Sequence, residues 1–74
     1  MRIKGTITKI ILTRGFGFIV GDEDGEDYFL HVDELIDGVE WERFRKGDRV
    51  EFEGVKVPKG KGNQLRAVEV SVVE

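Results

Sequence analysis

The stretch that carries most information about the fold of this chain is Arg14-Gly15-Phe16-Gly17-Phe18-Ile19-Val20. Phe16 and Phe18 stand two residues apart, so on a β-strand both rings project from the same face. Glycines alternate with them, and a glycine within a strand allows sharp bending and the close approach of another backbone. The stretch therefore predicts a strongly curved strand, residues 16–20, with two aromatic rings on one face.

A second aromatic strand is predicted at residues 27–32, which include Tyr28-Phe29-Leu30-His31-Val32. Phe29 and His31 alternate with the other three side chains and so share a face. The Asp24-Gly25 pair between the two strands predicts a hairpin with a two-residue type I′ turn. Pairing across this hairpin would gather four rings into one patch: Phe16, Phe18, Phe29 and His31.

This patch has two possible places, because aromatic pairs at this spacing are more often found in the core. If the patch faced inward, aliphatic residues such as Ile19 and Leu30 would face solvent. The aliphatic set makes the better core, and histidine is the more easily exposed residue. We therefore predict that the patch faces outward, and an exposed apolar patch indicates a binding partner.

Turn signals at short intervals predict three further strands, at residues 2–12, 49–57 and 64–73. In the first of them, simple alternation places Ile7, Lys9 and Ile11 on one face. Residues 58–62, rich in glycine and lysine, are expected to form a mobile basic loop. Five strands with a longer third connection predict an all-β fold, a five-stranded antiparallel Greek-key barrel of the OB type, in a single domain spanning residues 1–74. An SH3-like small barrel is the alternative.

Composition argues against several classes of function. The chain has no cysteine and one histidine, so disulfides and thiolate metal sites are excluded. No nucleophile–base pair is evident, so we expect no enzymatic activity, metal, cofactor or small-molecule substrate. No run approaches the ~20 apolar residues of a membrane span, and no signal peptide is visible. We expect a cytoplasmic monomer that does not contact membranes.

The net charge of −3 is unevenly distributed. Residues 22–27 contain five acidic side chains and no base, so the rest of the chain is net positive. Rings bordered by cations suit single-stranded RNA or DNA, because bases stack on the rings and cations meet the phosphates. The cations expected to contribute are Lys9, Arg14, Lys59 and Lys61. The alternative is a protein-interaction module that uses the same aromatic patch.

The two aromatic segments resemble the nucleic-acid-binding motifs of the cold-shock domain family. Residues 14–19 are similar to the family's first ribonucleoprotein motif, Lys-Gly-Phe-Gly-Phe-Ile, and residues 28–32 resemble its second, Val-Phe-Val-His-Phe. The resemblance extends over nearly the whole chain. It implies an OB-type barrel that binds single-stranded RNA or DNA, often as an RNA chaperone.

The chain departs from the family pattern at several positions. Lys9 and Ile10 stand where cold-shock domains usually carry a Trp-Phe pair, and Val32 replaces the aromatic residue that ends the second motif. The platform is therefore shortened, and weaker binding is expected. Trp41 falls where the family often has a loop aromatic, which implies an exposed base contact. Trp41 could instead cover the open end of the barrel beside Phe44.

Overall fold

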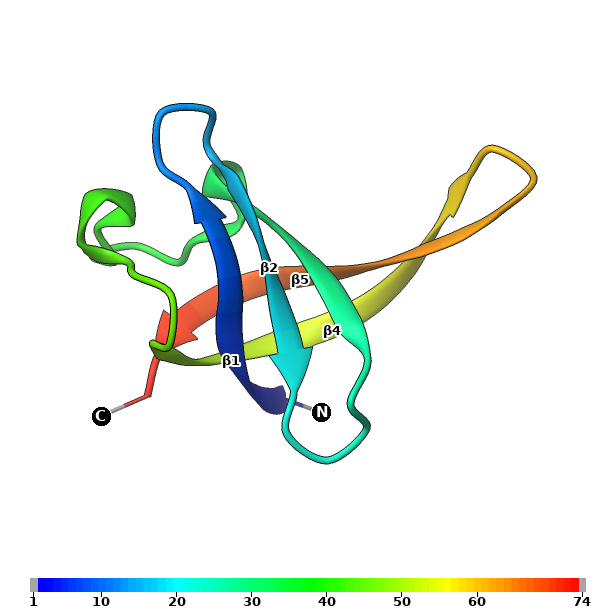
Figure 1. The fold of residues 1–74 in the computed structure, drawn as a ribbon, viewed down its shortest axis with the longest axis horizontal. Coiled ribbons are helices and arrows are strands. Elements are labelled where there is room, and N and C mark those ends of the chain that lie inside the picture. Colours follow the sequence, from blue (N-terminus) through cyan, green and yellow to red (C-terminus); the bar gives the residue numbers. More distant parts are fainter. Residues whose placement is uncertain (1, 74) are drawn as a thin grey trace.

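Five β-strands make up most of the structure, a computed structural model that describes residues 2–73. The strands are β1 (Arg2–Ile11), β2 (Phe16–Gly21), β3 (Asp27–His31), β4 (Arg49–Lys59) and β5 (Gly62–Val72). Two short 3₁₀-helices, η1 (Val32–Glu34) and η2 (Trp41–Arg43), lie in the connection from β3 to β4 (Figure 1). Within residues 2–73, no helix is long and apolar enough to cross a membrane.

The strands close into a barrel in the order β1-β2-β3-β5-β4. β1 pairs antiparallel with β2 and β4, and the pairs β2–β3 and β4–β5 are also antiparallel. β3 and β5 close the barrel as a parallel pair, in which Phe29 lies opposite Arg66. The predicted five-stranded Greek-key barrel is confirmed, but its closing pair is parallel because β4 intervenes in the chain between β3 and β5.

Alternation along β2 and β3 separates the barrel interior from its outer surface. Ile19 and Leu30 are fully buried, whereas Phe16, Phe18 and Phe29 are only partly buried. The interior side chains come from all five strands and from the β3–β4 connection: Ile7, Ile19, Tyr28, Leu30, Trp41, Phe44, Val50, Phe52, Ala67 and Val70. The aliphatic set therefore fills the core, and the aromatic patch lies outside it.

A change of register in β1 reverses one predicted face. Ile7 lies opposite Ile19, but the next paired residue of β1 is Lys9, opposite Phe18. The irregularity takes up Thr8, so Ile7 points into the core while Lys9 points outward and is exposed. The prediction that Ile7 and Lys9 share a face is wrong, because strict alternation does not hold across a β-bulge.

The β2–β3 connection is a wider turn than the sequence predicts. It spans residues 22–26, where Gly25 has a φ of 67° and Asp24 does not adopt positive φ. A type I′ turn needs positive φ at both central residues, so that prediction is wrong. The carboxylate of Asp24 instead accepts hydrogen bonds from the Glu26 amide (2.9 Å) and the Tyr28 hydroxyl (2.6 Å), which brace the turn against the barrel.

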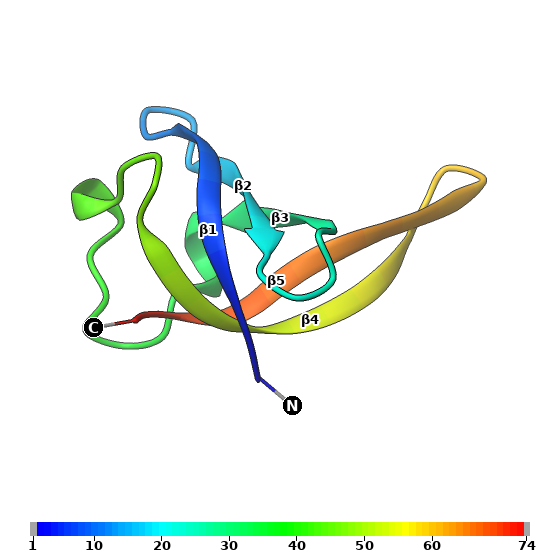
Figure 2. The same cartoon turned by 60° about the horizontal axis from the view of Figure 1, so that its bottom comes forward.

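Strands β4 and β5 continue past the barrel as a long twisted hairpin, here called the arm (residues 54–66). It is drawn yellow to orange in Figure 1, and Figure 2 shows it extending well away from the other strands. Pro58 pairs with Asn63 and Lys59 with Gly62. The predicted loop at residues 58–62 is therefore wrong: strand pairing continues to the turn at Gly60 and Lys61.

Gly17 is a position where the barrel tolerates no side chain. It lies opposite Ile10, and a Cβ added to it would collide with the carbonyl oxygen of Lys9 and lie 3.1 Å from the Ile10 Cα. We expect Gly17→Ala to lower the free energy of unfolding by at least about 1–3 kcal/mol, because the obstacle is backbone. Urea unfolding followed by circular dichroism measures this loss.

Gly62→Ala is the matched control. A Cβ at Gly62 meets open space, and its φ is not in the left-handed region. This variant should stay within about 1 kcal/mol of the wild type or gain slightly, through the lower entropy of its unfolded chain. Equal stability of the two variants would contradict the close packing of β1 on β2.

The Asp24–Tyr28 hydrogen bond predicts a dependence of stability on pH. The Asp24 carboxylate, helped by burial, raises the pKa of Tyr28 to about 12, and the Tyr28 hydroxyl and Glu26 amide hold the pKa of Asp24 below its usual value. Tyr28 therefore contributes stability below pH ~10 that is lost as the pH rises through its folded-state pKa. Asp24 contributes stability that is lost as the pH falls below its usual pKa.

Tyr28 is the only tyrosine, so tyrosinate absorbance reports this group directly. We expect a wild-type midpoint of about 12 and a lower one in Asp24→Asn, which lacks the charged acceptor. Glu23→Gln removes an equal charge from the same loop and should leave the midpoint unchanged. An Asp24→Asn protein that titrates like the wild type would disprove the role of this hydrogen bond.

Candidate nucleic-acid interface

The outer face of β2 and β3 carries four rings that lie against one another. Cross-strand pairing sets Phe16 opposite His31 and Phe18 opposite Phe29. We call these four residues the aromatic patch. All four are partly exposed, and each touches at least one other ring of the set. The structure thus places the four rings together on the outer surface, as expected from the sequence.

The rings of the patch hold defined angles to one another. Phe29 is nearly parallel to Phe16 (centroids 5.9 Å apart, planes 17° apart) and to His31 (6.3 Å, 28°). Phe18 stands edge-on to Phe16 (6.4 Å, 88°) and to Phe29 (5.7 Å, 74°). Offset and edge-to-face contacts at such distances are favourable, so the rings support one another before any ligand binds.

His31 is oriented by the backbone that follows it. Its Nδ1 accepts a hydrogen bond from the Asp33 amide (3.1 Å), and this contact also caps η1. A neutral imidazole that accepts at Nδ1 carries its proton at Nε2. The ring is therefore held in place by one nitrogen and offers a donor at the other, which suits both stacking and hydrogen bonding.

The predicted cations lie at different distances from the patch along the fold. Lys9 is exposed and directly opposite Phe18 on the neighbouring strand, and Arg14 is exposed in the turn that leads into Phe16. Lys59 lines a cleft beside the patch. Lys61 lies in the turn at the end of the arm, beyond this cleft. The structure thus brings Lys9 and Lys59 to the patch, sets Arg14 at its end and leaves Lys61 further out.

Ion pairs occupy several cations elsewhere on the barrel. Arg2 pairs with Glu51 (3.4 Å), Arg49 pairs with Asp22 of the acidic loop, and Arg43 approaches Glu40 (3.9 Å). Lys9 and Arg14 form no ion pair with any residue between 2 and 73. The negative net charge is therefore compatible with uncompensated cations beside the patch, where phosphates would approach.

A cleft of about 450 Å³ lies between the patch and the arm. Phe18 and Phe29 form its apolar wall, and polar side chains of the β2–β3 hairpin and the arm face them. The full lining consists of Phe18, Glu26, Asp27, Phe29, Lys59, Asn63, Gln64 and Leu65. An apolar wall opposed by a few polar groups is typical of a small-ligand or single-base site.

Trp41 does not belong to this surface. Only 6% of it is exposed, its Nε1–H donates to the Leu12 carbonyl oxygen (3.0 Å), and its ring stands edge-on to Phe44 (5.9 Å, 88°). The prediction that Trp41 is exposed for base contact is therefore wrong. Its indole instead belongs to the hydrophobic core and joins the β3–β4 connection to the turn after β1.

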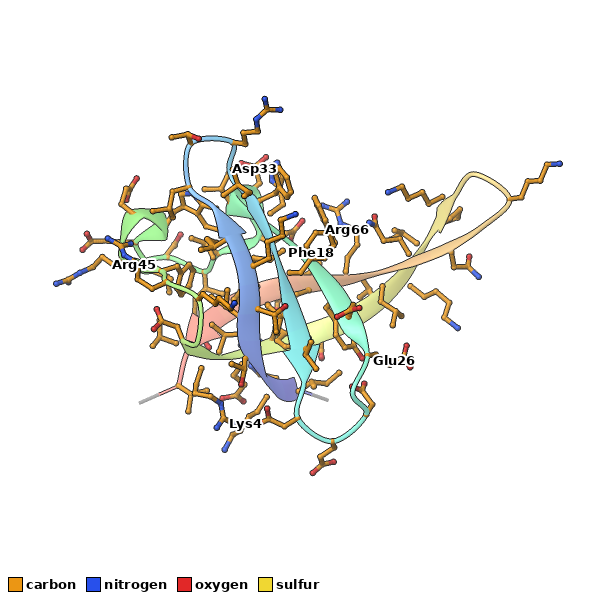
Figure 3. All side chains as sticks on the ribbon, viewed as in Figure 1. Lys4, Phe18, Glu26, Asp33, Arg45 and Arg66 are labelled. Carbon is orange, nitrogen blue, oxygen red and sulfur yellow. The ribbon has the colours of Figure 1, made fainter. Side chains whose placement is uncertain are left out.

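Arg66 is a residue of this surface that the sequence analysis missed. It lies opposite Phe29 across the closing pair, with its guanidinium carbon 5.4 Å from the Phe29 ring centroid. One row of outward side chains thus crosses four strands: Lys9, Phe18, Phe29 and Arg66. Figure 3 labels Phe18 and Arg66 over the same face of the barrel. Alternation with buried Ala67 indicated an outward Arg66, but nothing local indicated its parallel partner.

The family comparison agrees with this arrangement. A sequence profile described as the "Cold-shock" DNA-binding domain matches residues 3–73. The chain belongs to the cold-shock domain family. Membership favours the OB-type barrel over the SH3-like alternative.

Relatives of this cold-shock domain include both short and long proteins. It is 40% identical over 57 residues to the cold shock-like protein CspA of Stigmatella aurantiaca, covering 76% of this chain and 81% of that protein. It is also 40% identical over 73 residues to the glycine-rich protein 2 of Nicotiana sylvestris, covering 95% of this chain but only 31% of that relative. The whole activity of such longer proteins therefore does not transfer to this chain.

A solved structure shares the fold. The chain matches the Drosophila protein described as Unr CSD456 with a TM-score of 0.75 and 26% sequence identity. The match covers all of this chain and 27% of that one. The barrel thus corresponds to one part of a longer structure that is named for its cold-shock domains.

The burial of Trp41 leads to a prediction that separates it from the patch. Trp41→Phe keeps an aromatic ring but leaves the Leu12 carbonyl without its donor. We expect a loss of about 1–3 kcal/mol in the free energy of unfolding, from the orphaned carbonyl and the smaller ring. Oligonucleotide affinity, measured at a temperature where the variant is folded, should stay within twofold of the wild type. A large loss of affinity in a folded Trp41→Phe protein would return Trp41 to the interface.

Proposed function

We propose that this cold-shock domain binds single-stranded RNA or DNA by stacking unpaired bases on the aromatic patch. The observation that carries the proposal is the group of four mutually supported, outward-facing rings beside cations that lack carboxylate partners. Each base that stacks on an aromatic side chain contributes about 1–3 kcal/mol with little regard to sequence. Lys9, Arg14, Lys59 and Lys61 would meet the phosphates.

The patch favours unpaired strands, because bases within a duplex already stack on one another. Binding therefore shifts a hairpin toward its open form by mass action. This passive mechanism amounts to RNA-chaperone activity and requires no chemical step, in keeping with the expectation that the protein is not an enzyme. A monomer suffices for it, because one barrel carries the whole patch. Monomeric state and cytoplasmic location stay predictions.

Lys9 alters the platform that the resemblance implies. It occupies the position opposite Phe18 where the family usually places a tryptophan, so one stacking surface is exchanged for a charge. Fewer bases are then held by stacking, and a larger share of the affinity comes from phosphate contacts. We expect binding that is weaker and more sensitive to salt than in family members that carry the tryptophan.

Fluorescence anisotropy of labelled hexauridine and hexathymidine, at low and moderate salt, tests the proposal. Phe16→Ala and Phe29→Ala should each weaken binding roughly 5- to 150-fold, the equivalent of one lost stacked base. Both variants should unfold at nearly wild-type urea concentrations, because their rings lie outside the core. Truncation of a buried ring such as Phe52 would cost about 3–5 kcal/mol.

Val72→Ala is the control for these variants. Val72 is an exposed apolar residue at the end of β5 remote from the arm, so its truncation should leave affinity unchanged. If wild-type protein fails to bind either oligonucleotide at high micromolar concentration, the proposal is wrong and the protein-interaction alternative takes its place. If both Phe variants unfold, the patch is part of the core.

A further inference from the structure

Arg66 carries unused hydrogen-bonding capacity at the edge of the aromatic patch. Its guanidinium lies over Phe29, its Nε is buried, and this Nε has no hydrogen-bond partner in the structure of residues 2–73. Within the same residues no carboxylate pairs with it. A desolvated cationic donor without an acceptor is unfavourable in the free protein. The missing acceptor would come from a ligand that enters the neighbouring cleft.

The cleft sets a carboxylate and an amide near this guanidinium. β3 and β5 run parallel with Phe29 opposite Arg66, so Asp27 and Gln64, each two residues earlier, project from the same outer surface. Both line the cleft whose wall is formed by Phe18 and Phe29. A planar base stacked on this wall would therefore meet a cationic donor from one side and an acidic acceptor from another.

We infer that this cleft is a guanine-selective base site in which Arg66 is the specificity-determining residue. The inference rests on the proposed binding of single strands and names the base that the cleft prefers. Guanine presents two adjacent acceptors, O6 and N7, which match the paired donors of a guanidinium. Its opposite edge presents the N1–H and N2–H₂ donors, which match the Asp27 carboxylate.

The other bases satisfy only part of this arrangement. Adenine places an amino donor beside N7, where Arg66 needs a second acceptor. Uracil and thymine have no pair of adjacent donors for Asp27. Cytosine can donate its amino group to a carboxylate but offers no O6/N7 edge. Among the four bases, guanine alone uses both charged groups at once.

Single guanosine substitutions in hexauridine test this inference. The guanosine is placed at each of the six positions in turn, and parallel series carry adenosine or cytidine. At one position, guanosine should raise the affinity about tenfold over uridine, as expected for one bidentate base contact. Equal affinities for all four bases, or a preference for adenosine or cytidine, would overturn the inference while leaving the proposed function intact. Failure of every oligonucleotide to bind would instead remove the proposed function.

Variants at position 66 assign the preference. Arg66→Ala should bind all four hexamer series with affinities within about twofold of one another, because the donor pair is gone. Arg66→Lys keeps the charge but not the planar fork, so it should lose the preference for guanosine and retain the wild-type salt dependence. A preference for guanosine that persists in Arg66→Ala would show that another residue creates it.

Lys56→Ala is the matched control for these variants. Lys56 lies on the same arm, next to Val55, which pairs with Arg66, and strand alternation turns it to the opposite face. Its removal takes away an equal charge without touching the cleft. The variant should keep the tenfold preference for guanosine, and loss of the preference here would mean that net charge, rather than Arg66, determines it.

Discussion

The close approach of Gly17 to the backbone of β1 governs the shape of the barrel and of its outer face. With no side chain at position 17, the Lys9 carbonyl and the Ile10 Cα come within contact of β2. The two strands can then coil tightly enough for a five-stranded sheet to close on itself. The same coiling raises the neighbouring Phe16 and Phe18 on the convex side, so barrel closure and ring presentation depend on one glycine.

The bulge beside this contact determines what surrounds the rings. Because it takes up Thr8, Ile7 stays in the core while Lys9 moves to the outer surface opposite Phe18. On the far side of the row, Arg66 reaches the surface from β5. The outer face therefore presents rings between two cations, while acidic side chains pair with arginines on other parts of the barrel. This arrangement reconciles an acidic chain with an affinity for polyanions.

Features encoded within a few residues could be predicted from the sequence. The alternation of Phe16 with Phe18 and of Phe29 with His31 gave their shared face, and the surrounding aliphatic residues gave the direction of the core. Features that depend on distant partners could not be predicted. Trp41 is buried by a hydrogen bond to Leu12, and Asp24 avoids a type I′ turn because Tyr28 holds its carboxylate. Arg66 became part of the site only through a parallel pairing that no hairpin signal reports.

The arm shows the same limit. Its proline, glycines and lysines are typical of a loop, yet pairing between β4 and β5 continues to the last residues before the turn. Proline is tolerated there because this part of the ribbon lies beyond the barrel, where a missing amide breaks no essential ladder bond. Composition alone therefore underestimated the length of both strands and placed Lys59 in a mobile loop rather than on the wall of a cleft.

The parallel seam between β3 and β5 gives the barrel a place to breathe. Its paired position joins Phe29 to Arg66, whereas the antiparallel ladders hold the other strands at many positions. Local opening of a fold begins where the fewest contacts must break. A strand of nucleic acid lying on Phe29 and Arg66 would bridge this seam like a clasp. Occupancy would then slow amide hydrogen exchange along β3 and β5, although no backbone atom needs to move.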